Sequence, residues 1–287
     1  MDWIVKKSYD LLLEDSNLIK LTFIAFLPYS LIFVWYLFYQ TYFILTSAQS
    51  WVHWSELKLY IENIFAFSWN HIVLALIVAS LILVAYFFIP PIAEAALIEY
   101  LDKKKWVWYA IWKWLLKFFH MFELHWFLSL FSFLFFFIVV SRLYVLKMLD
   151  PVFVVPFLIT WFFFILFFNF TWIYSKYLVV LEDLTPFEAI KKSIVLTFLN
   201  LRKTWKYFML YLMFYIRFLI NVLVIVGLPI LILYLFLKAN VSNASLVRYT
   251  IYFLMLLLFI LTAYVNGIVE AFFVTMWYNV FKEIEKN

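Results

Sequence analysis

The sequence predicts an all-α integral membrane protein that crosses the bilayer six times. Of its 287 residues, 68% are hydrophobic, 25% are aromatic and 14% are charged, whereas roughly a quarter of an ordinary soluble domain is charged. The mean hydropathy is +1.01. A water-soluble fold cannot hide this much apolar surface, because its outside must be largely polar. Lipid is therefore the predicted solvent for most of the chain.

Six long apolar segments each exceed the roughly 20 residues that a helix needs to cross a bilayer. The first is not predicted to be a signal peptide, because its apolar core is too long and acidic residues precede it. The loops leave no room for an independent soluble domain, so residues 1–287 form one predicted membrane domain. The predicted spans are Leu18–Thr46, Ile72–Tyr100, Glu123–Leu146, Val152–Leu181, Trp205–Leu237 and Leu246–Phe281.

The lysines and arginines predict the orientation. Sixteen fall on the side that holds both termini, five fall on the opposite side, and Arg217 lies inside a span. By the positive-inside rule, both termini are expected in the cytoplasm.

Two short segments on the predicted cytoplasmic side are amphipathic but too polar to cross. In the N-terminal segment, Asp2, Lys6, Asp10 and Glu14 recur every four residues. The second segment is Trp106–His120, an aromatic stretch with one polar stripe. That stripe consists of Tyr109, Lys113, Lys117 and His120.

A third segment has the clearest helix start in the chain. Thr185 can cap, Pro186 suits the first turn, and Glu188 can complete a capping box. Apolar residues then recur at helical spacing at Phe187, Ile190, Ile194 and Phe198. We expect all three segments to form elbow helices, meaning helices that lie in the headgroup layer.

The elbow segments also suggest an internal repeat. Ile4–Ser8 resembles Ala189–Ser193, and Ile92–Ala95 resembles Ile268–Ala271. We predict three units of one elbow and two spans each, over residues 1–101, 102–182 and 183–287.

The run Leu181–Ser193, in which a span ends in an acidic turn and an elbow follows, resembles a known family. It is similar to the prokaryotic membrane proteins related to the membrane domain of glycerophosphoryl diester phosphodiesterases. The resemblance implies a bundle of about six helices with interfacial elbows, located in the cell (inner) membrane. It implies no reaction, because that group has no settled activity and no phosphodiesterase domain is present here.

Ionisable residues inside spans are costly and are candidate functional groups. Arg217 and Glu270 are predicted at similar depth on antiparallel spans, with Asn221 and Asn266 one turn further out on the same faces. We hypothesise an ion pair, which either fixes helix register or serves a proton or a substrate. Two further residues are candidates for this intramembrane cluster. They are Glu94, the predicted repeat counterpart of Glu270, and Asn169 on the fourth span. Glu94 follows Pro90 and Pro91, which are expected to kink or break the second span; the alternative for Glu94 is a carboxylate that reaches the interface together with Glu99.

The basic residues of the elbows are candidate contacts for lipid headgroups. Cations beside aromatic residues favour anionic lipids by about 1 kcal/mol each; the alternative is a topological anchor with no specific lipid. The candidates are Lys103, Lys104, Lys105, Lys113, Lys117, Lys191 and Lys192.

The composition argues against several chemistries. The chain has no cysteine and only two glycines, which leaves no thiolate site and no glycine-rich phosphate loop. His120, Glu123 and His125 fit a metal site poorly, because the histidines lie about 140° apart on a helix. No catalytic residue, cofactor, metal or nucleic-acid partner is predicted.

Three function classes follow. The first is a non-enzymatic membrane protein that handles or organises lipids or small solutes. The alternatives are the transmembrane subunit of a multi-component transporter and a lipid-modifying enzyme. Membrane lipids are the predicted partners, and no particular protein partner is predicted.

Overall fold

The computed structural model describes residues 2–28, 30–32, 69–103, 106–132, 135–136, 139–140, 151–214, 220 and 244–286. Within these ranges the regular structure is helical, with no strand. The helices are α1 (Trp3–Glu14), an apolar helix over Ser16–Ile32, α4 (Trp69–Lys103), α5 (Val107–Leu116), α6 (Phe118–Leu130), α8 (Pro151–Thr171), α9 (Ser175–Glu182), α10 (Pro186–Leu199), α11 (Leu201–Phe214) and α14 (Ala244–Glu285).

Three helical stretches in the described ranges are long and apolar enough to cross a membrane. They are Leu76–Lys103, Val154–Glu182 and Leu256–Glu285, with mean hydropathies of 2.4, 2.1 and 2.0. These stretches fall on the second, fourth and sixth predicted spans. Much of the first, third and fifth predicted spans lies outside the described residues.

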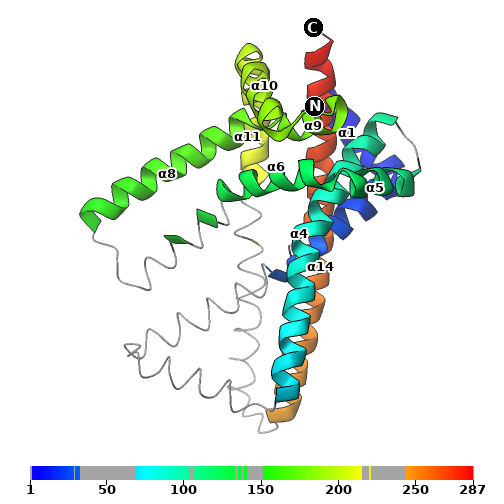
Figure 1. Cartoon of the computed structure of the whole chain (residues 1–287), viewed down its shortest axis with the longest axis vertical. Helices are drawn as coiled ribbons and strands as arrows, with labels where there is room; N and C mark the ends of the chain where they lie inside the picture. Colours follow the sequence, from blue (N-terminus) through cyan, green and yellow to red (C-terminus); the bar gives the residue numbers. More distant parts are fainter. Residues whose placement is uncertain are drawn as a thin grey trace.

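Helices α4 and α14 run side by side in the same direction, and their C-terminal ends lie together (Figure 1). The first half of each helix is largely exposed, whereas burial becomes dense from Pro90 onward in α4 and from Gly267 onward in α14. The protein core therefore lies at one end of this helix pair, and the exposed apolar halves extend away from it.

The core end is where the shorter helices collect, as Figure 1 shows for α1, α5, α6, α9, α10 and α11. Helix α1 packs on α14, α5 packs on α4, and α10 packs on α9. A buried hydrogen bond fixes the N-terminus to this end, because the Asn279 amide donates to the Ser8 hydroxyl at 2.9 Å. The Tyr207 hydroxyl donates to Asp2, also at 2.9 Å.

The third amphipathic segment begins where the sequence predicts. Helix α10 starts at Pro186, and Thr185 donates both its backbone N–H and its hydroxyl to the Glu188 carboxylate, at 3.1 Å and 2.7 Å. The face that α10 buries differs from the predicted apolar stripe. It is the small-residue stripe Ala189, Ser193 and Thr197, because these side chains let α10 approach its neighbours closely.

Two further sequence features have definite structural outcomes. Pro90 and Pro91 are buried inside the continuous helix α4, so they do not break it. Gly267 lies where α14 meets the Ser16–Ile32 helix, and a Cβ built there would stand 3.1 Å from the Phe23 Cα. A larger residue at this position would press on backbone, which would have to move by a few tenths of an ångström because it cannot rotate away as a side chain can.

Candidate functional site

A charged cluster lies inside the helix-dense end, centred on Glu94 of α4. Lys176 of α9 forms an ion pair with the Glu94 Oε1 atom. His125 of α6 places its Nδ1 atom 3.9 Å from the Glu94 Oε2 atom. The three side chains are each largely buried. The two oxygens of one carboxylate thus face a lysine and an imidazole that come from different helices.

Tyr177 connects this cluster to α14. Its buried hydroxyl donates to the backbone carbonyl of Val274 at 2.9 Å. Both Glu94 and Glu270 lie close enough to act electrostatically on that hydroxyl. The cluster therefore joins α4, α6, α9 and α14.

The remaining residues of the predicted intramembrane cluster have separate positions. Asn169 of α8 donates to the carbonyls of Phe131 and Ile165, both at 2.8 Å, so it ties α8 to the C-terminal end of α6. Asn266 lies one turn before Glu270 on α14. Arg217 and Asn221 lie outside the described residues, and the Arg217–Glu270 ion pair stays a prediction.

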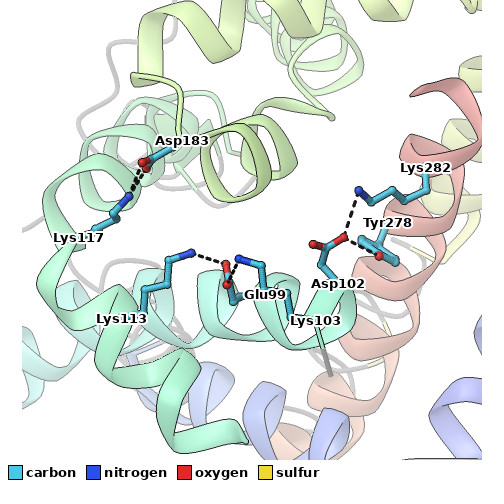
Figure 2. A network of polar contacts seen from close by, with 8 residues as sticks. All are labelled: Glu99, Asp102, Lys103, Lys113, Lys117, Asp183, Tyr278 and Lys282. Carbon is cyan, nitrogen blue, oxygen red and sulfur yellow. Dashed lines mark hydrogen bonds and ion pairs between the residues drawn. The ribbon is translucent and has the colours of Figure 1, made fainter. Parts of the chain in front are cut away.

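A second polar network surrounds the C-terminal end of α4 (Figure 2). Glu99, whose side chain is only 2% exposed, accepts from Lys103 and from Lys113 of α5, both at 2.7 Å. At the end of α4, Asp102 accepts from Lys282 and from the Tyr278 hydroxyl of α14, both at 3.1 Å. This network fastens α5 and α14 to the end of α4.

The turn between α9 and α10 belongs to the same network. Asp183 is in the left-handed region, with φ 59°, and it ends α9. Lys117 forms an ion pair with this carboxylate. The lysine ammonium holds the pKa of Asp183 below its ordinary value of 3.8, mainly by hydrogen bonding. At neutral pH the carboxylate is therefore ionised.

Most of the predicted headgroup lysines in the described ranges have carboxylate partners within the protein. Lys103 and Lys113 share Glu99, as stated above, and Lys192 pairs with Glu182 of α9. Lys191 is exposed on α10. Lys104 and Lys105 lie outside the described residues, and contact between any of these lysines and lipid stays a prediction.

Sequence reasoning named Glu94 but missed the partners that define its environment. From sequence alone, Lys176 is interpreted as one of the cytoplasmic cations and His125 as an interfacial histidine. Neither residue shares a helix with Glu94, so helical spacing does not connect them to it. The pairing spans 82 residues of sequence, and no local spacing signals it. Among the described residues, no group of three or more histidine, cysteine or acidic side chains is placed to hold a metal ion.

The Glu94 cluster brings together groups that can take part in acid–base exchange. A carboxylate held by a lysine on one oxygen leaves its other oxygen open to an imidazole, which can gain or lose a proton. Comparison of the chain with family models, with curated proteins and with solved structures finds no match. The resemblance of Leu181–Ser193 to the phosphodiesterase-related membrane proteins stays a prediction.

Proposed function

We propose that this chain is a non-enzymatic inner-membrane protein that organises lipids at the cytoplasmic face. In this proposal the six predicted spans cross the bilayer, both termini are cytoplasmic, and the three elbow helices belong to three related units. The three apolar helices long enough to cross support it. The N-terminus also lies at the same end of the molecule as the C-terminus (Figure 1), which an even number of crossings requires.

One observation carries this proposal. The helices at the core end bear large apolar side chains that point away from the protein, although water would disfavour them. On α1 these are Trp3 and Leu13, and on α10 they are Phe187, Phe198 and Leu199. Helices with this character bind at the boundary between headgroups and acyl chains. Such helices at one membrane face would hold and order the adjacent lipids.

Spin-labelled phospholipids in proteoliposomes test this function. The number of motionally restricted lipids per protein is measured with the label near the headgroup. Replacing Phe187 and Phe198 by alanine is expected to lower this number, because both side chains are exposed and α10 keeps its buried stripe. The matched control replaces Phe163 and Phe157, exposed on α8, and is expected to leave it unchanged. Equal effects of both pairs would argue against the proposal.

The buried Glu94 cluster favours a second candidate, the passage of protons or small solutes through a transmembrane subunit. A charged group within a span is a candidate proton-relay site. Proton flux into proteoliposomes under an imposed potential separates the candidates. For passage, the native chain conducts and Glu94→Gln abolishes the flux, whereas Glu99→Gln, near the C-terminal end of α4 and outside the Glu94 cluster, preserves it. For lipid organisation, neither the native chain nor either variant conducts.

A further inference from the structure

On a usual surface helix the charged side faces solvent, whereas on α5 the lysine side faces the protein. Its lysine side is closed onto the protein, because Lys113 reaches Glu99 and Lys117, the residue after α5, reaches Asp183 (Figure 2). Its buried side carries Ala110 and Trp114. Both lysines are predicted headgroup contacts, yet in the structure each is paired with a carboxylate of the protein.

The outward side of α5 is almost wholly apolar. At about 100° per residue, Trp108, Trp112, Leu115 and Leu116 fall within an arc of roughly 100°, and Phe119 continues it into α6. Trp112 is 62% exposed and Leu116 is 82% exposed. We call Trp108, Trp112, Leu115, Leu116 and Phe119 the aromatic face. Both lysines of segment 106–120 are engaged elsewhere, so this face carries no lysine of its own.

The position of the aromatic face identifies its occupant. Helix α5 begins at Val107, four residues after the candidate span Leu76–Lys103 ends. It lies across the end of α4 rather than along it (Figure 1). A surface that continues directly from the end of a membrane-crossing helix meets the membrane–water interface, where tryptophan is enriched.

We infer that the aromatic face binds the bilayer interface by burying its side chains, whatever the charge of the headgroups. This inference rests on the proposed function and specifies the partner. The partner is a lipid surface, and a surface made of zwitterionic lipid alone is sufficient. Glu99 and Asp183 neutralise the two lysines that would otherwise select anionic lipid. Freeing one lysine should therefore create a local anionic preference that the native chain lacks.

The absence of cysteine allows a single label to report on this surface. Leu116→Cys carries a fluorophore, and the protein is placed in vesicles of zwitterionic lipid or of zwitterionic and anionic lipid mixed. Quenching by doxyl-labelled lipid reports contact with lipid, and quenching by iodide reports contact with water. Lys191→Cys, at an exposed lysine of α10, gives a comparison position outside the aromatic face.

Leu116→Cys is expected to be quenched by lipid and shielded from iodide in both kinds of vesicle, with equal quenching by zwitterionic and anionic doxyl lipid. Adding Asp183→Asn frees Lys117, and the anionic quencher is then expected to be favoured by up to about fivefold. This variant preserves the turn, because asparagine readily adopts positive φ.

Three results would overturn the inference. Strong anionic preference in the native background would show that charge drives binding, while the proposed lipid function would stand. Shielding from both quenchers would show that a second copy or another protein covers the face. Iodide access in both kinds of vesicle would remove the inference and would count against the proposed function as well.

Discussion

Two ion pairs at the same helix should differ several-fold in strength. Lys113 and Lys117 lie one turn apart, yet Glu99 is 2% exposed and Asp183 is 63% exposed. A hydrogen bond to a charged group in a buried setting contributes about 1.5–3 kcal/mol, whereas an exposed pair contributes about 0.2–1 kcal/mol. Lys103 also holds Glu99, which keeps this carboxylate satisfied when Lys113 is removed.

The measurement is a pair of double-mutant cycles. One cycle combines Glu99→Gln with Lys113→Gln, and the other combines Asp183→Asn with Lys117→Gln. We expect coupling free energies of about 2 kcal/mol for the first pair and below about 1 kcal/mol for the second. The free energy of unfolding is measured by titrating mixed micelles with a denaturing detergent.

Salt supplies an internal control for these cycles. The Lys117–Asp183 coupling should fall as ionic strength rises, while the Lys113–Glu99 coupling should change little, because buried charges are screened less. Equal couplings, or a stronger coupling at Asp183, would show that burial of Glu99 does not govern how α5 is held.

Three further predictions follow from the fold. The ion pair of Asp183 stabilises the protein at neutral pH, and this stabilisation is lost as pH falls below the ordinary pKa of 3.8. The difference in unfolding free energy between the native protein and Asp183→Asn should therefore vanish on acid titration. A difference that stays constant with pH would refute this. Gly267→Leu should separate α14 from the helix that contains Phe23 and cost at least about 1–3 kcal/mol of unfolding free energy; unchanged stability would contradict the close approach. Ser8→Ala should cost about 1–3 kcal/mol, because the buried Asn279 amide loses its acceptor, and a double variant with Asn279→Leu should recover part of this loss.

Some of this protein could be derived from its sequence because the signals are local. Composition alone indicates lipid as the surrounding solvent, since no arrangement of these side chains yields a largely polar outside. The start of α10 follows from the order Thr185, Pro186 and Glu188, because a capping box involves neighbouring residues only. The same holds for the amphipathic character of segment 106–120, which helical periodicity fixes.

The tertiary structure decided which way those helices turn. Periodicity shows which residues of α5 share a face, but the choice of the face that meets protein depends on Glu99 and Asp183, which belong to other elements. In the same way, the ion-pair partner of Glu94 lies 82 positions away in the sequence. A side chain at position 267 is disfavoured only because the backbone of another helix lies opposite it. Burial and charge pairing between distant segments set these outcomes, and local spacing carries no record of them.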